Sequence, residues 1–97
     1  MSKTVNVPQI IQKEDVAKLH FTNMEILDDP KEILQRAIDL QRATALGNTE
    51  KEKCKIYFRA NEGFFRVNTT IWATTEKYVS LKEGISIPIC CILRVGV

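Results

Sequence analysis

Two different hydrophobic periods divide the chain near residue 50. Between residues 30 and 46, apolar side chains recur every three or four positions, which is typical of an amphipathic helix. From residue 53 onward they alternate with polar side chains, as in CKIYFRA at 54–60, which is typical of strands with one buried face. The pattern therefore predicts one helix over 30–46 followed by a sheet, an α+β fold.

Capping signals give the predicted helix its bounds. Asp29 can accept hydrogen bonds from backbone N–H groups of the first turn, and Pro30 suits the first helical position. Gly47 can adopt the left-handed conformation that often follows a helix, so we expect the helix to end by Leu46. Residues 1–25 show no clear period and are interpreted as a variable, partly ordered arm.

Turn signals divide the region 53–95 into five short strands. The sequence NEG at 61–63 predicts a hairpin, Gly84 permits a tight return, and Pro88 marks a place where ladder pairing stops because proline has no N–H to donate. The predicted strands are 54–60, 64–74, 78–83, 85–89 and a last one through Ile92, Leu93 and Val95.

This order of elements resembles the Sm-like small barrels along residues 31–95. KIYFRANEGFFRV resembles the first hairpin of that fold, YVSLKEG its third strand, and ISIPICCILRV the fourth strand, short turn and fifth strand. The resemblance implies an amphipathic helix followed by a five-stranded antiparallel barrel over 53–95.

Two motifs of the Sm-like family differ in this chain. Sm proteins and their bacterial RNA-chaperone relatives carry a glycine in the bent second strand and a Lys-His or Arg-Gly motif at the last turn, whereas this chain has VNTTIW and PICCI. No RNA-binding residue of the family therefore carries over. The segment TTIWATTEKYVSLKEGISIPI also resembles short bacterial proteins of uncharacterised function, which implies no activity.

The length and composition predict a single domain of the globular class. A chain of 97 residues is too short for two hydrophobic cores, and 44% hydrophobic with 27% charged residues is ordinary for such a domain. The apolar run Ile85–Leu93 is about half the length of a membrane-spanning helix. Since MSKTVNVPQI lacks the features of a secretory signal, we expect a cytoplasmic protein without membrane contact.

The three cysteines predict neither a disulfide framework nor a metal site. Cys54, Cys90 and Cys91 are odd in number and lack the paired short spacings of structural zinc sites. If Cys90 and Cys91 continue a strand, they point to opposite faces, and one fills the core. A cysteine-dependent enzyme or redox sensor is the least favoured hypothesis, because the one histidine, His20, lies in the arm. We expect a protein that is not an enzyme and has no cofactor or metal.

Cations alternate with aromatic rings on the predicted strand face opposite the core. Residues 51–97 carry eight basic and four acidic side chains, net +4, whereas residues 26–50 carry three and five, net −2. Three interpretations stay open: the helix covers Trp72 and Phe64, the face binds single-stranded nucleic acid, or it binds a protein. The candidate binding residues are Tyr57, Arg59, Arg66, Trp72 and Lys82.

The apolar C-terminal segment CCILRVGV predicts an edge strand that can pair with a second copy of the chain. The alternative is that residues 1–25 cover this edge. The leading functional hypothesis is a non-catalytic interaction module, a self-associating scaffold or protein-binding component. The main alternative is a protein that binds RNA or single-stranded DNA through its basic and aromatic strand face.

Overall fold

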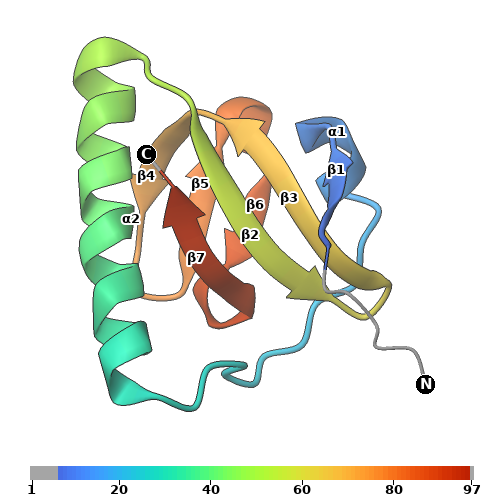
Figure 1. Ribbon diagram of the computed structural model, residues 1–97. Helices are drawn as coiled ribbons and strands as arrows, with labels where there is room; N and C mark the ends of the chain where they lie inside the picture. Colours follow the sequence, from blue (N-terminus) through green and yellow to red (C-terminus); the bar gives the residue numbers. More distant parts are fainter. Residues whose placement is uncertain (1–6, 97) are drawn as a thin grey trace.

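A computed structural model describes residues 7–96 and contains one long helix and seven strands within that range (Figure 1). Short helices of one turn join some of the strands. The elements are β1 (Gln9–Ile11), α1 (Lys13–Val16), α2 (Pro30–Glu50), β2 (Cys54–Ala60), β3 (Gly63–Thr69), β4 (Ile71–Thr74), β5 (Tyr78–Leu81), η1 (Lys82–Gly84), β6 (Ser86–Pro88), η2 (Ile89–Cys91) and β7 (Ile92–Gly96).

The strands form two separate sheets, so the predicted five-stranded barrel is wrong. The first sheet has four strands in the order β1-β3-β2-β7, with β1 parallel to β3 and the other neighbours antiparallel. The second has three antiparallel strands in the order β4-β5-β6. Neither sheet closes on itself, and in residues 7–96 no strand pairing joins the two.

Two local features separate the sheets. The stretch 64–74, predicted as one strand, is divided at Thr70, so that β3 and β4 pair with different partners. Pro88 then ends β6, and the 3₁₀ turn η2 turns the chain before β7 begins. The chain thus leaves one sheet after β3 and returns to it at β7, which pairs with β2.

Helix α2 begins where its caps predicted and ends later than expected. The Asp29 side chain accepts a hydrogen bond of 2.9 Å from the backbone N–H of Lys31, which confirms the start at Pro30. The helix continues to Glu50, and Lys51 takes the left-handed conformation with φ 57°. Gly47 is buried within the helix, where a Cβ atom would collide with the Ile71 carbonyl oxygen. Its role is to let α2 approach β4, not to end the helix.

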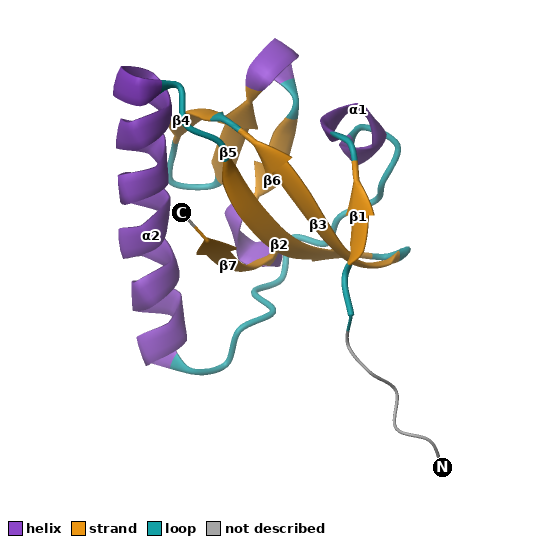
Figure 2. Ribbon diagram, turned by 45° about the horizontal axis from the view of Figure 1, so that its top comes forward, coloured by secondary structure: helices purple, strands orange, loops and turns teal. Residues whose placement is uncertain are grey.

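The core lies between the two sheets, and α2 flanks it (Figure 2). In β2 the side chains of Ile56 and Phe58 point inward and are fully buried, as the alternation predicted. The segment before α2 also belongs to this core, since Val16 is buried and the ring of Phe21 lies 5.8 Å from that of Phe58. The arm predicted for 1–25 therefore contains packed structure at Val16 and Phe21, whereas residues 1–6 lie outside the described range.

Candidate functional site

The outer face of the four-stranded sheet gathers cations and aromatic rings. Since Ile56 and Phe58 point into the core, the alternate residues of β2 point away from it. Figure 1 shows the second sheet behind β2 and β3, with no helix over their opposite side. The basic sheet face, as we call this surface, consists of Lys55, Tyr57, Arg59, Phe64, Arg66 and Arg94.

Cross-strand pairing aligns these side chains in rows. Arg66 is opposite Tyr57, and Tyr57 is opposite Arg94, so one row crosses β3, β2 and β7. The Arg94 guanidinium carbon lies 4.2 Å from the centre of the Tyr57 ring. In the next row Arg59 pairs with Phe64, and its guanidinium carbon lies 5.6 Å from that ring. These distances suit cation–π contacts between the arginines and the rings.

Among the described residues, the basic sheet face contains no acidic side chain to balance its cations. None of the four strands β1, β3, β2 and β7 contains an aspartate or glutamate. Among the ion pairs found between residues 7 and 96, none involves any of the four cations of this face. The Nε atom of Arg66 is buried and has no hydrogen-bond partner within the described chain. Within the part of the chain that the structure describes, these cations therefore have no carboxylate partner.

The one acidic residue in the β2–β3 turn is occupied elsewhere. Glu62 accepts a hydrogen bond of 3.0 Å from the backbone N–H of His20, and its other carboxylate oxygen lies 2.5 Å from Nδ1 of the same residue. These contacts hold the pKa of Glu62 below its usual value. The carboxylate thus ties the segment before α2 to the turn instead of neutralising the basic sheet face.

The structure brings together only part of the predicted site. Tyr57, Arg59 and Arg66 lie on the basic sheet face. Trp72 belongs to β4 and Lys82 to η1, on the side of the second sheet. Trp72 is 55% exposed, so the interpretation in which α2 covers it is wrong for this residue.

Two cations of the face escaped the sequence prediction. Lys55 could have been found, because it alternates with Tyr57 and Arg59 in the same strand. Arg94 could not, since its place beside Tyr57 depends on the pairing of β7 with β2, across an irregular register between Tyr57 and Phe58. Nothing in the last strand alone indicates which partner it takes.

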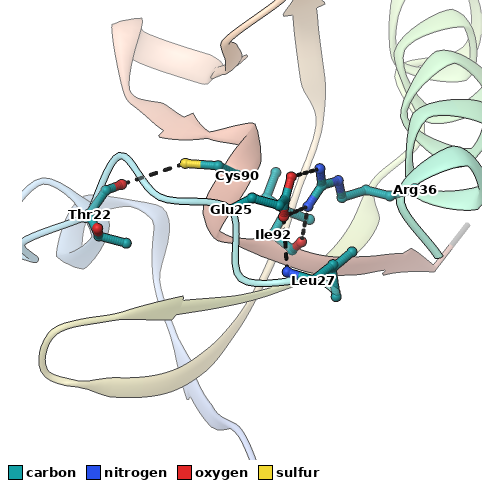
Figure 3. A network of polar contacts seen from close by, with 6 residues as sticks. All are labelled: Thr22, Glu25, Leu27, Arg36, Cys90 and Ile92. Atoms are coloured by element: carbon teal, nitrogen blue, oxygen red, sulfur yellow. Dashed lines mark hydrogen bonds and ion pairs between the residues drawn. The ribbon is translucent and has the colours of Figure 1, made fainter. Parts of the chain in front are cut away.

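A second polar feature is a groove of about 930 Å³ between the segment before α2, the second sheet and η2. Arg36 lines this groove with a side chain only 5% exposed, and Figure 3 shows its polar contacts with Glu25 and Ile92. The two terminal nitrogens of Arg36 donate to the two carboxylate oxygens of Glu25, Nη1 at 2.7 Å and Nη2 at 2.5 Å. Nη1 also donates to the Ile92 carbonyl at 2.9 Å. Hydrogen bonds from Arg36 lower the pKa of Glu25. This arginine is therefore engaged within the fold.

Cys90 and Cys91 do not continue a strand, so the predicted opposite orientation is wrong, although Cys91 is fully buried, as expected for one of the two. They lie in the 3₁₀ turn η2, and both thiols donate to the Thr22 carbonyl, at 3.5 Å from Cys90 and 3.2 Å from Cys91. The strand alternation behind the prediction does not apply in a helical turn. Burial, with a smaller contribution from Cys90, raises the pKa of the Cys91 thiol to about 11.

Neither a metal cluster nor a membrane helix is found in residues 7–96. No three His, Cys, Asp or Glu side chains in this range gather as they would around a metal ion. No helix in the same range has the length and apolar character needed to cross a membrane. Comparison with known proteins finds no matching family model, no matching curated protein and no matching solved structure. The functional argument therefore rests on the geometry of this chain.

Proposed function

We propose that the protein binds single-stranded nucleic acid, RNA or DNA, on the basic sheet face. The observation that carries the proposal is a set of four cations and two aromatic rings on a sheet without acidic residues, where no cation of the set has a carboxylate partner among residues 7–96. Phosphate groups would supply the missing negative charge. Proteins that bind single strands combine such cations with rings on which bases stack.

The rows suggest how a strand would lie on the face. One row crosses three strands from Arg66 through Tyr57 to Arg94, a span of about 10 Å at the usual strand spacing. Arginine can contact a phosphate with two parallel hydrogen bonds, and its planar group can also stack on a base. The pairs of Arg94 with Tyr57 and of Arg59 with Phe64 thus present flat surfaces to bases beside donors for phosphates.

The shape of the face favours single strands over duplexes. The major groove of DNA admits a helix or a two-stranded ribbon, whereas this face is a four-stranded sheet. Rings on a broad sheet can stack only on bases that are not already paired and stacked with each other. Contacts to phosphates and ring faces carry little sequence information, so we expect weak dependence on base sequence.

The direct test is binding of a fluorescent single strand of about 12 nucleotides, followed by anisotropy at several salt concentrations. If all four cations contact phosphates, the logarithm of the association constant should fall with a slope of up to about −2.8 against the logarithm of salt concentration. That slope means roughly 50-fold weaker binding when salt rises from about 50 to about 200 mM. No binding at the lower salt concentration, or equal binding of a duplex of the same sequence, would contradict the proposal.

A protein-binding module, the leading hypothesis from the sequence, remains the second candidate function. It is favoured by large apolar side chains on the surface: Trp72 is 55% exposed, and Leu34 and Ile38 of α2 are 62% and 45% exposed. Pairing through the last strand is less favoured than the sequence suggested, because α2 packs against β7. Self-association is tested by size-exclusion chromatography with light scattering, which measures the mass of the protein at two concentrations. A mass of one chain at both concentrations would exclude it under those conditions.

A further inference from the structure

The 3₁₀ turn η2 gives the chain a pair of thiols directed at one atom. The Sγ atoms of Cys90 and Cys91 lie 3.5 Å and 3.2 Å from the same oxygen, the Thr22 carbonyl. Figure 3 shows the contact of Cys90, on the side of η2 that faces the segment before α2. Both sulfurs therefore converge on one backbone oxygen from the same turn. The turn thus creates a vicinal dithiol.

We propose that Cys90 and Cys91 form a binding site for a soft, thiophilic ligand that takes two sulfur donors, the class represented by monosubstituted trivalent arsenicals. This site is distinct from the basic sheet face and does not depend on the proposed nucleic-acid binding. Thiolates are the protein ligands that such soft centres prefer.

The ligand class follows from the number of sulfurs and from their surroundings. The third cysteine, Cys54, is buried on β2 with its thiol 3.5 Å from the Thr69 carbonyl, so it belongs to another site. A structural zinc site needs about four ligands, and no group of three His, Cys, Asp or Glu occurs within residues 7–96. Two sulfurs alone suit a ligand that needs two bonds to protein, as a trivalent arsenic with one organic group does.

Access to the dithiol comes from the groove. Cys90 is half-buried and lines the groove of about 930 Å³, whereas Cys91 lies behind it and is fully buried. A ligand would therefore meet Cys90 first and reach Cys91 once the thiols release the Thr22 carbonyl. The backbone hydrogen bond of 3.1 Å from Ile26 to the Cys90 carbonyl does not involve either sulfur and can persist.

The bonding step balances without an oxidant. An aryl arsenic oxide reacts with the two thiols to form two arsenic–sulfur bonds, and the two thiol protons leave with the oxygen as one water molecule. Arsenic stays trivalent and both sulfurs keep their oxidation state. The cost of breaking two weak S–H···O contacts is small beside the two covalent bonds formed.

The test uses phenylarsine oxide with the reduced, folded full chain and intact-mass measurement. We expect one adduct per chain that survives an excess of a monothiol and is removed by a dithiol such as dimercaptopropanol. The matched control is Cys54→Ala, which removes the other buried cysteine and should keep the adduct. Cys90→Ala and Cys91→Ala should each lose the adduct that resists a monothiol.

A second measurement needs no variant, which matters if a cysteine substitution prevents folding. After reaction with the arsenical, the wild-type chain is unfolded and alkylated, and peptide mapping shows which thiols were protected. We expect protection of Cys90 and Cys91 together, with Cys54 alkylated. No adduct on the folded chain, an adduct only after unfolding, or protection that includes Cys54 would overturn the proposal.

Discussion

Arginine has opposite roles in two regions of the molecule. In the groove, the Arg36 side chain is 5% exposed and donates to Glu25 and to the Ile92 carbonyl, so its charge is paired inside the fold, although its Nε atom has no hydrogen-bond partner within the described chain. On the basic sheet face, Arg66 and Arg94 have no carboxylate partner among the described residues and lie in a row with an aromatic ring. The difference indicates that the first arginine serves stability and the others are available to a ligand.

The largest expected effect comes from breaking the groove pair. Glu25→Ala leaves the buried Arg36 charge without its carboxylate, which should lower the free energy of unfolding by about 3 kcal/mol. Urea unfolding followed by circular dichroism measures this loss. The matched control is Glu76→Ala, an exposed carboxylate that also lines the groove and forms no ion pair in the described chain.

A double variant tests whether the loss comes from the unpaired charge. Replacing Glu25 and Arg36 together by leucine removes both charges, and it should cost less than Glu25→Ala alone because no buried charge is left unpaired. If Glu25→Ala lowers the free energy of unfolding no more than Glu76→Ala does, Arg36 does not serve stability. The contrast with the arginines of the basic sheet face would then be wrong.

On the basic sheet face, charge reversal should change binding more than it changes stability. Arg66→Glu with Arg94→Glu removes two charge-assisted contacts and adds two repulsive charges, so we expect at least about 100-fold weaker binding of the single strand at low salt. The matched control is Lys77→Glu with Lys82→Glu, which changes the net charge equally on the side of the second sheet. Anisotropy titration measures both variants. Equal losses in the two would mean that binding follows net charge and not this face.

A smaller effect is expected from acid. The pKa of Glu25 is lowered in the folded protein by its hydrogen bonds to Arg36, whereas the unfolded chain should have a value of about 4.3. The pair therefore stabilises the fold at pH values above the unfolded pKa, and this contribution is lost as pH falls through the folded pKa. Unfolding free energies measured from pH 7 down to about pH 3 should fall more steeply in the wild type than in Glu25→Gln.

The control for the acid experiment is Glu62→Gln. Glu62 also has a lowered pKa, from its hydrogen bonds with His20, but its side chain is 38% exposed, so solvent screens much of its contribution. We expect Glu62→Gln to reduce the fall of the unfolding free energy at acid pH less than Glu25→Gln does. Parallel curves for the wild type and Glu25→Gln would show that the groove pair contributes nothing to the acid dependence.

Local signals in the sequence predicted the elements better than their arrangement. Asp29 and Pro30 determine the start of α2 because capping depends on neighbouring residues only. Gly47 was misinterpreted, because the same residue type suits a helix end and a close approach to another backbone, and only the position of Ile71 distinguishes them. The division at Thr70 likewise depends on which strands pair, which no period in the sequence reveals.

The candidate site shows the same limit. Strand alternation was enough to place Tyr57, Arg59 and Arg66 on one side, since all three belong to the β2–β3 hairpin. It failed for Trp72, because the chain changes sheets between β3 and β4. It also failed for the two adjacent cysteines, because a short apolar run after Pro88 can form a strand or a 3₁₀ turn.

The smallest expected effect concerns the two predicted site residues that the fold separates from the others. Trp72→Ala and Lys82→Ala should change single-strand binding by no more than about twofold, because both residues lie on the side of the second sheet. At that place Lys82 contributes only long-range, screened charge, and Trp72 contributes no charge. The matched variant on the basic sheet face is Tyr57→Ala, which removes a ring that bases can stack on and should weaken binding by roughly tenfold. Anisotropy titrations at one low salt concentration compare the three. If Trp72→Ala has the larger effect, the nucleic acid lies on the three-stranded side, and the four cations of the basic sheet face are not its binding site.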